Sequence, residues 1–230
     1  MPDHHLRPER IAHRGAPREF DENTLDGFLR ALERGADAVE LDVHRTRDGA
    51  VVIHHDPELT GPDGHRKPIA NLSEAEIARC RLPRGGRVPT LAAVMDAIGD
   101  RATVYIELKG AGVGDAAVDV ARRHGVRYAF HGFDREAVLA MRARWPGLTY
   151  GVLFDAGTPD AEALAKRYPV RDLWPHWSLV TPGFVRAAHA AGKRVLVWTV
   201  NDLDEARRLS ALGVDGLCTD DVRLLDAVGG

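Results

Sequence analysis

The stretch TVYIELKGAGVGDAAVDVARRHGVRYAFHGF, from Thr103 to Phe133, contains the repeating unit of this chain. Thr103 to Lys109 is rich in β-branched and aromatic side chains and predicts a strand. Asp115 to His124 predicts a helix, and Arg127 to Phe133 predicts a second strand. A strand, a helix and another strand in this order indicate two parallel strands joined by a helical crossover.

The same alternation continues toward the C-terminus. After Asp134 to Arg144, which predicts the next helix, the strand and helix pairs are Leu148 to Phe154 with Asp160 to Tyr168, Asp172 to Pro175 with Pro182 to Ala191, Arg194 to Val200 with Asp202 to Ala211, and Gly213 to Thr219 with Asp221 to Val228. Strands near Ile11 and Val39 bring the parallel candidates to eight. Eight βα units predict an α/β fold, a (β/α)8 TIM barrel rather than an open doubly wound sheet, and a single domain over residues 1–230.

Composition limits the classes of partner and compartment. The 230 residues are 44% hydrophobic and 28% charged, and a formal net charge of −3 leaves no basic excess to neutralise a nucleic-acid backbone. Cys80 and Cys218 form no CxxC motif, which argues against a disulfide framework or a thiolate metal site. Met1 to Arg10 lacks the apolar stretch of a secretory signal, and no run of about 18 apolar residues indicates a membrane span. We therefore expect a cytoplasmic protein with a small-molecule substrate, no nucleic-acid partner, no membrane span and no evident protein partner.

The N-terminal part begins the barrel. Ile11 to Gly15 is a short apolar entry ending in two polar residues and a glycine, which predicts a buried strand whose tip opens into a turn. Thr24 to Arg34 predicts a helix, because its apolar residues recur at helical spacing, with Asn23 or Thr24 as N-cap and Gly35 as the stop.

Val39 to Asp56 predicts a β-hairpin extension. Val39 to Thr46 and Ala50 to His55 are both rich in β-branched residues, and Asp48-Gly49 between them is a strong signal for a two-residue turn. The return run is therefore antiparallel and does not count among the eight barrel strands.

The two-residue turn also predicts a register. It sets Arg47 opposite Ala50, Asp42 opposite His55 and Glu40 opposite Pro57. Because side chains alternate between the faces of a strand, we expect Glu40, Asp42 and His55 on one face. The alternative is that the two carboxylates are only the polar side of an edge strand.

Residues 57–89 predict a small insertion after the second barrel strand, because glycine and proline punctuate the segment. Ser73-Glu74-Ala75-Glu76 is a capping box at the start of a short helix. The segment is too short and too poor in apolar residues for a core of its own, so we expect it to fold over the barrel mouth. The alternative is an idle surface loop.

Polar side chains stand at the carboxyl ends of neighbouring strands, where barrels of this class carry their active sites. The strand that begins at Val39 contributes Glu40 and Asp42, and the strand Thr103 to Lys109 contributes Glu107. Three converging carboxylates require a cation, and an all-oxygen set suits Mg²⁺ or Ca²⁺ better than zinc. The alternative for any single carboxylate is a salt-bridged barrel residue.

Histidines and basic residues complete this cluster. His13 and His55 would flank the cation from different strands, as an acid and a base do in a proton-transfer mechanism. Arg14 and Lys109 add positive charge. A divalent cation with two basic side chains forms a pocket for an oxyanion, and phosphoryl chemistry is the commonest reaction that needs one.

The chain closely resembles the bacterial glycerophosphodiester phosphodiesterases, of the phosphatidylinositol-phospholipase-C-like barrel group. The resemblance spans almost the whole chain. The motifs that carry it, in the family's order, are His13-Arg14-Gly15, Glu22-Asn23-Thr24, Glu40-Leu41-Asp42, Thr46-Arg47-Asp48-Gly49, His55-Asp56, Pro89-Thr90-Leu91, Glu107-Leu108-Lys109, Trp198-Thr199-Val200-Asn201, Asp215-Gly216 and Thr219-Asp220.

The resemblance implies a role for each site residue. The metal ligands would be Glu40, Asp42 and Glu107, the acid and base would be His13 and His55, and the phosphate contacts would be Arg14 and Lys109. Phe133, His176 and Trp198 would line the substrate side, although each taken alone is also explained by core packing. His131-Gly132-Phe133 departs from the family's usual serine and phenylalanine at the end of the strand Arg127 to Phe133, which removes one hydroxyl from the pocket.

The resemblance implies metal-dependent hydrolysis of glycerophosphodiesters to sn-glycerol 3-phosphate and an alcohol such as choline, ethanolamine or glycerol. One divalent cation, Mg²⁺ or Ca²⁺, is the implied cofactor. Two alternatives are a phosphodiesterase acting on lysophospholipids and a non-catalytic barrel that binds a phosphorylated metabolite.

Overall fold

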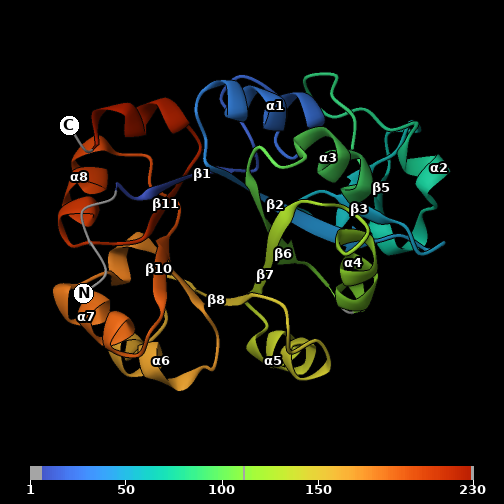
Figure 1. Cartoon of the computed structure of the whole chain (residues 1–230). Coiled ribbons are helices and arrows are strands. Elements are labelled where there is room, and N and C mark those ends of the chain that lie inside the picture. Colours follow the sequence, from blue (N-terminus) through green and yellow to red (C-terminus); the bar gives the residue numbers. More distant parts are fainter. Residues whose placement is uncertain (1–6, 111, 229–230) are drawn as a thin grey trace. The chain divides into compact units, whose positions relative to one another are not determined.

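The computed structural model describes residues 7–110 and 112–228, in two compact units. The N-terminal unit is Ala12–Tyr128, and the C-terminal unit runs from Ala129 onward and includes Glu9–Ile11 (Figure 1). The described residues contain eight barrel strands: β1 (Glu9–His13), β2 (Ala38–Arg45), β6 (Thr103–Leu108), β7 (Arg127–Gly132), β8 (Tyr150–Phe154), β9 (Asp172–Pro175), β10 (Arg194–Val197) and β11 (Gly216–Thr219).

These strands follow the order β1-β11-β10-β9-β8-β7-β6-β2, and β1 also pairs with β2. That is the order of a closed eight-stranded barrel, so the predicted (β/α)8 fold is confirmed. The strands are covered on both faces: all of Ala38–His44 in β2 and all of β8 are buried. β3 (Val51–Ile53) extends the sheet beyond β2 as the only antiparallel addition among the described strands of that sheet.

Helices connect the strands, and side-chain caps determine where most of them begin. They are α1 (Leu25–Glu33), α3 (Leu91–Ile98), α4 (Val113–Ala121), α5 (Arg135–Arg144), α6 (Ala161–Arg167), α7 (Pro182–Ala190) and α8 (Leu203–Ala211). Thr24, Thr90, Asp134, Thr181 and Asp202 each accept a backbone N–H from the first turn. The helix predicted over Asp221 to Val228 is instead the 3₁₀ helix η3 (Val222–Ala227), whose cap Asp221 bonds the N–H of Arg223.

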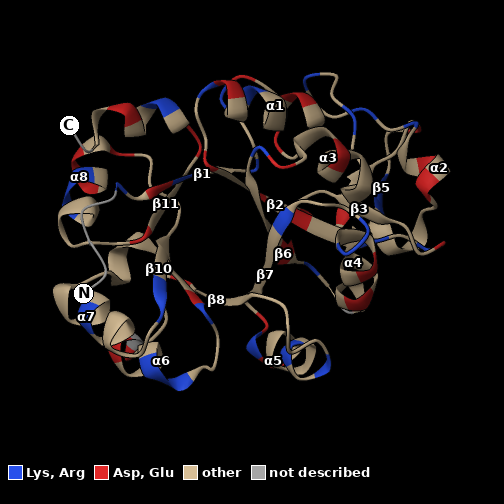
Figure 2. Ribbon diagram, in the orientation of Figure 1, with Lys and Arg blue, Asp and Glu red and all other residues tan. Residues whose placement is uncertain are grey.

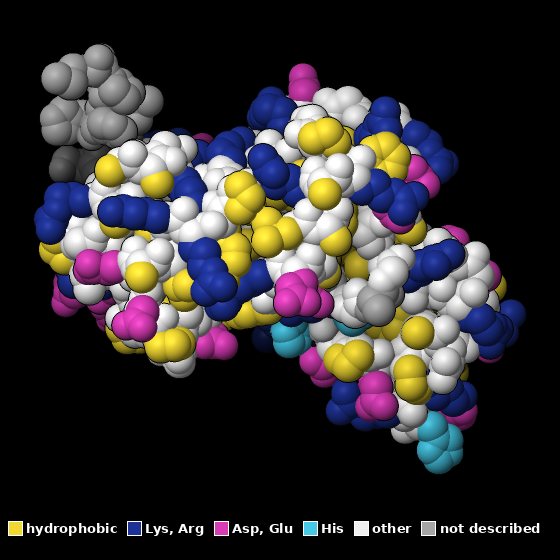
Figure 3. All heavy atoms as spheres, turned by 90° about the horizontal axis from the view of Figure 1, so that it is seen from below, with side chains coloured by type: hydrophobic (Ala, Val, Ile, Leu, Met, Phe, Trp, Pro, Cys, Tyr) yellow, Lys and Arg dark blue, Asp and Glu magenta, His cyan; other side chains and the backbone are white. Residues whose placement is uncertain are grey.

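Helices α1, α5, α6 and α8 carry charged residues of both signs (Figure 2). On the face in Figure 3, hydrophobic side chains appear in small groups among charged ones. Within the described residues no helix has both the length and the apolar character needed to cross a membrane.

The predicted hairpin forms, but its register differs by one residue. Val43 pairs with Ile53 and Arg45 with Val51, and the carbonyl of Asp42 accepts the N–H of His54 at 3.0 Å. The prediction that Asp42 lies opposite His55 is therefore wrong. Glu40 does not face Pro57 either, because its carbonyl accepts the N–H of Arg14 at 3.0 Å.

The turn itself explains the shift. The N–H of Thr46 bonds the carbonyl of Ala50 at 2.9 Å, which leaves three residues, not two, in the loop. Gly49 has φ of +91° and its N–H bonds the carbonyl of Thr46, the geometry of a three-residue loop that ends in a left-handed glycine. Asp48 stabilises this loop: Thr46 Oγ1 lies 2.6 Å from Asp48 Oδ1, and the N–H of Glu74 donates to the same carboxylate at 3.1 Å.

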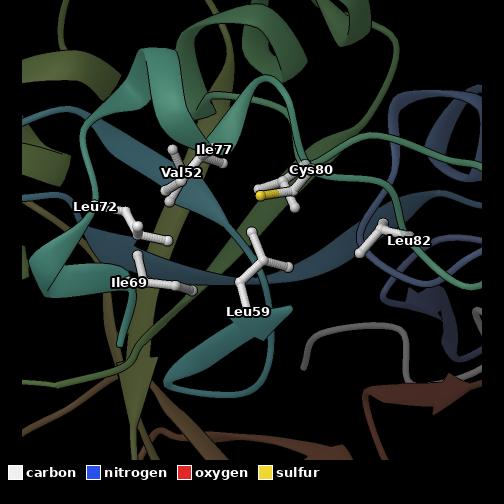
Figure 4. Close-up of a cluster of buried hydrophobic side chains, with 8 residues drawn as sticks. Val52, Leu59, Ile69, Leu72, Ile77, Cys80 and Leu82 are labelled. Carbon is white, nitrogen blue, oxygen red and sulfur yellow. The ribbon is translucent and has the colours of Figure 1, made fainter. Parts of the chain in front are cut away.

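The insertion contains the short strands β4 (Glu58–Thr60) and β5 (Arg66–Pro68), the 3₁₀ helix η1 (Ile69–Asn71) and helix α2 (Glu74–Ile77). The predicted capping box of Ser73 and Glu76 is present. Its apolar side chains pack around Val52 of β3 (Figure 4) in a cluster of Leu59, Ile69, Leu72, Ile77, Cys80, Leu82 and Val88. The insertion thus shares a small core with the hairpin. That it covers the barrel mouth stays a prediction.

The end of the insertion is tied to the loop that precedes α1. The carboxylate of Asp21 accepts the backbone N–H groups of Arg84 and Gly86, each at 2.9 Å. The Arg84 guanidinium in turn donates to the carbonyl of Phe20 at 3.1 Å. We call these reciprocal bonds the Asp21–Arg84 clasp.

The contacts of Asp48 predict how stability depends on pH. Its bond from Thr46 and the N–H of Glu74 lower the pKa of the Asp48 carboxyl. A lowered pKa in the folded chain means that the ionised group stabilises the fold above its unfolded pKa of about 3.9, and that this contribution is lost as the pH falls through the folded pKa. Asp48→Asn should be less stable than the wild type at pH 7, and the difference should shrink toward pH 3. Urea midpoints measured from pH 7 to pH 3 test this, and a difference that grows on acidification contradicts it.

Candidate active site

Three carboxylates are buried side by side in the N-terminal unit. The parallel pairing of β2 and β6 aligns Asp42 with Glu107, and Glu40 precedes Asp42 by two residues on the same face. Glu40, Asp42 and Glu107 are 3%, 0% and 7% exposed, and an oxygen of Glu40 lies within 4.8 Å of one of Glu107. The structure therefore brings together the three carboxylates that the sequence indicated.

Two cations compensate this negative charge. Lys109 Nζ lies 2.7 Å from Glu107 Oε1 and 3.3 Å from Asp42 Oδ1, and Arg14 Nε lies 3.2 Å from Asp42 Oδ2. Burial alone would raise the pKa of the Asp42 carboxyl, but the guanidinium of Arg14 and the ammonium of Lys109 outweigh it and lower that pKa. Burial alone would lower the pKa of Arg14 and of Lys109. The neighbouring carboxylates outweigh this effect, and the pKa of both groups is raised. These mutual shifts favour the charged forms of Asp42, Arg14 and Lys109.

Asn23 holds Asp42 in place, a role that its sequence pattern did not suggest. Thr24 is the N-cap of α1, which leaves the fully buried Asn23 to turn inward. Its Nδ2 donates to Asp42 Oδ2 at 2.8 Å, and its Oδ1 accepts the N–H of Asp42 at 3.4 Å. Asn23 has φ of +58°, a left-handed conformation that asparagine tolerates better than most residues. An asparagine at this position is thus the sequence feature that could have indicated the left-handed backbone.

His55 follows β3 and is held at two points. Its Nδ1 lies 3.0 Å from Asp56 Oδ1, and its carbonyl accepts the Nε2–H of His44 at 3.1 Å. His44 is buried on β2, and burial lowers the pKa of its imidazole, so the ring is neutral and donates through Nε2. Attraction to His55 also lowers the pKa of Asp42, although the register places His54 opposite Asp42.

His13 is the last residue of β1, and Arg14 follows it with φ of +56°. The turn is tight, because a Cβ added at Gly15 would lie 2.8 Å from the carbonyl carbon of Gly27. Glu22 fixes the far side of Arg14, with Nη1 at 3.2 Å from Oε1. The strand end thus presents His13 beside a firmly held guanidinium.

The predicted substrate-lining residues lie together in the C-terminal unit. Trp198 meets the ring of Phe133 edge-on at 5.4 Å and that of His176 edge-on at 5.6 Å. Phe133 is 41% exposed, which rules out core packing for that residue. His131, in contrast, is buried with its ring stacked on Trp174 at 4.5 Å.

The donor set fits a hard divalent cation. Carboxylate oxygens are the ligands that Mg²⁺ and Ca²⁺ prefer, and all three carboxylates here are buried. Asp42 Oδ1 accepts no hydrogen bond from any described residue. A cluster with buried negative charge, fixed cations and an oriented imidazole can bind a phosphate group and move protons at its oxygens.

Comparisons with known proteins agree with this chemistry. The sequence model of the glycerophosphoryl diester phosphodiesterase family matches residues 13–224. A glycerophosphodiester phosphodiesterase from Caldanaerobacter subterraneus subsp. tengcongensis is 29% identical over 94% of this chain and 95% of its own. A crystal structure of a glycerophosphodiester phosphodiesterase from Thermotoga maritima superposes with a TM-score of 0.81 at 28% identity, covering 96% of this chain and 98% of the other. The structure of an Oleispira antarctica phosphodiesterase in complex with the product sn-glycerol-3-phosphate superposes with a TM-score of 0.85 at 27% identity, covering 96% of each chain.

The bond from His44 to the carbonyl of His55 predicts a measurable loss of stability. His44→Ala leaves that carbonyl without its donor, which costs about 1–3 kcal/mol of unfolding free energy. His44→Gln carries an amide N–H near the position of Nε2 and should recover part of the loss. Chemical denaturation of the three proteins tests this, and equal losses in both variants would show that the hydrogen bond contributes nothing.

Proposed function

The chain belongs to the glycerophosphoryl diester phosphodiesterase family, and we propose that it hydrolyses glycerophosphodiesters to sn-glycerol 3-phosphate and an alcohol. The observation that carries this proposal is the cluster of Glu40, Asp42 and Glu107 with Arg14 and Lys109 around one buried site. The structural likeness to the Oleispira antarctica enzyme, which holds the product sn-glycerol-3-phosphate, supports the same reaction.

Glu40, Asp42 and Glu107 would hold one divalent cation, Mg²⁺ or Ca²⁺. When bound, the cation supplies Lewis-acid polarisation of the phosphate and neutralises charge that develops on its oxygens. Arg14 and Lys109 bind the phosphate oxygens, because they already point at the carboxylate cluster and are half-buried there. Their fixed positions reduce the reorganisation that binding a dianionic product requires.

His13 and His55 exchange the protons. One removes a proton from the attacking hydroxyl, either water or the glycerol 2-hydroxyl, as a new P–O bond forms. The other protonates the alcohol oxygen as its bond to phosphorus breaks. Where the glycerol 2-hydroxyl attacks, the first product is a cyclic phosphate, and water then opens it to sn-glycerol 3-phosphate as the bond between phosphorus and the 2-oxygen breaks. The contact between His55 Nδ1 and Asp56 Oδ1 at 3.0 Å, which lowers the pKa of Asp56, supports a tautomer with the proton on Nδ1 and with Nε2 free for proton transfer.

The first test measures alcohol release from glycerophosphocholine with Mg²⁺, Ca²⁺ or Mn²⁺. His55→Ala should lower kcat by about 10²–10⁴-fold, because a general acid or base is lost. His54→Ala is the matched control, since His54 neighbours it and lies opposite Asp42 in the hairpin. If the His54 variant loses turnover and the His55 variant keeps it, the assignment belongs to the wrong histidine. No turnover with any metal or head group would refute the proposed function.

The second test concerns the phosphate contact. Lys109→Ala should weaken binding of sn-glycerol 3-phosphate by about ten- to hundredfold, the value of a charge-assisted bond to a phosphate oxygen. Titration calorimetry of the product measures this directly. Lys67→Ala, which removes a lysine from β5 whose partner is Asp63, is the control and should bind normally. Unchanged product affinity in the Lys109 variant would exclude Lys109 as a phosphate contact.

A further inference from the structure

The two carboxylate oxygens of Asp42 have different partners within the N-terminal unit. Oδ2 accepts a hydrogen bond from Nδ2 of Asn23 at 2.8 Å, and Nε of Arg14 lies 3.2 Å from the same oxygen. Oδ1 accepts no hydrogen bond from any described residue, and Nζ of Lys109 approaches it as an ion pair at 3.3 Å. The protein therefore holds Oδ2 by a hydrogen bond, whereas Oδ1 keeps its lone pairs for a further ligand.

The position of Asn23 is itself fixed by the backbone around it. Its N–H donates to the carbonyl of Arg14 at 2.9 Å, and its side-chain Oδ1 accepts the N–H of Asp42 at 3.4 Å. The residue is fully buried, and its backbone has φ of +58°. Thr24, which follows, caps α1 by accepting the N–H of Gly27 at 3.3 Å. The Asn23 amide is thus held between the turn after β1 and the start of α1.

The two bonds between Asn23 and Asp42 constrain the direction of the carboxylate. One bond goes to the side chain of Asp42 and the other to its backbone N–H, so that they close a ring through the same two residues. The charges of Arg14 and Lys109 attract the carboxylate, but Coulomb attraction depends on distance and leaves rotation of the group open. A hydrogen bond also depends on angle. Asn23 is therefore the uncharged group that determines which oxygen of Asp42 is bonded to the protein.

The number of oxygens that a carboxylate offers affects the choice of cation. Mg²⁺ demands near-ideal octahedral geometry at about 2.0–2.1 Å, whereas Ca²⁺ accepts about six to eight oxygens in a flexible shell, from carboxylates that bind through one oxygen or through both. The narrow bite of a carboxylate that binds through both oxygens suits the Ca²⁺ shell better than an octahedron. A carboxylate that offers one oxygen therefore favours Mg²⁺, and one that can rotate to offer both loses this preference.

We propose that Asn23 is a positioning residue for the cation: it holds Oδ2 of Asp42, so that Oδ1 is the single oxygen that Asp42 offers, and this favours Mg²⁺ over Ca²⁺. The inference rests on the proposed function, in which Glu40, Asp42 and Glu107 hold one divalent cation. It specifies how the protein distinguishes two cations that the three carboxylates alone do not distinguish. Asn23 acts through Asp42 and is not a ligand.

Calorimetric titration of the protein with MgCl₂ and with CaCl₂, without substrate, tests this inference. Asn23→Gly removes the amide and keeps the left-handed backbone, which glycine adopts readily. The variant should bind Mg²⁺ about 10- to 100-fold more weakly, the usual effect of losing a group that orients a metal ligand, and its Ca²⁺ affinity should change by less than about threefold. Asn71→Gly is the matched control at an exposed asparagine, and it should change neither affinity.

A role of Asn23 in the fold alone predicts a different result. Asn23→Ser, which keeps a smaller hydrogen-bonding group, is the second variant, and its Mg²⁺ affinity should fall between those of the wild type and Asn23→Gly. Circular dichroism and urea midpoints show whether both variants are folded. If the affinities for Mg²⁺ and Ca²⁺ fall equally, if neither falls, or if neither variant folds, Asn23 supports only the fold and the inference is overturned.

The titrations also separate this inference from the proposed reaction, because they need no substrate. If the wild type hydrolyses no glycerophosphodiester but Asn23→Gly selectively loses Mg²⁺ affinity, the role of Asn23 stands and the proposed reaction fails. If the wild type is active, the ratio of kcat/KM for glycerophosphocholine with Mg²⁺ to that with Ca²⁺ should fall in Asn23→Gly. A wild type that binds neither cation would overturn the inference.

Discussion

A carboxylate with no exposed surface, Asp42, makes the strongest demand on the N-terminal unit. A buried charge without partners costs several kcal/mol, so its neighbours must supply both charge and hydrogen bonds. Arg14 at the end of β1, Asn23 before α1 and Lys109 after β6 meet this demand from three different elements. The left-handed backbone at Arg14 and Asn23 is tolerated because these bonds compensate it. The buried charge of Asp42 therefore requires the end of β1, the start of α1 and the end of β6 to lie close together.

Much of the fold could be predicted from the alternation of strand and helix patterns and from the capping residues in the sequence. The alternation of strand and helix patterns from Thr103 onward predicted the barrel, and capping residues such as Thr24 and Asp202 marked helix starts to within a residue. Helix α3 was not predicted, because its N-cap Thr90 follows the run of prolines and glycines that marks the insertion. The two-residue period of β2 and β6 was enough to place Glu40, Asp42 and Glu107 on one face, since alternation needs no knowledge of distant contacts.

What could not be predicted depends on side chains that bond distant backbone. The hairpin register shifted by one residue because Asp48 contacts Thr46 and the N–H of Glu74, which favours a loop one residue longer than the Asp-Gly pair suggests. Asn23 and His44 hold Asp42 and His55 through bonds that no local pattern encodes. Such bonds need the tertiary fold before they can form, so sequence spacing alone does not reveal them.

The Asp21–Arg84 clasp makes the loop before α1 and the end of the insertion depend on each other. The loop that leads into Glu22 and Asn23 is anchored at Asp21 by the far end of the insertion. A chimaera that received residues 57–89 from a relative without a partner for Asp21 would release this anchor beside Asn23, even with every proposed catalytic residue retained. An exchange of the insertion between family members should therefore include the loop after β1.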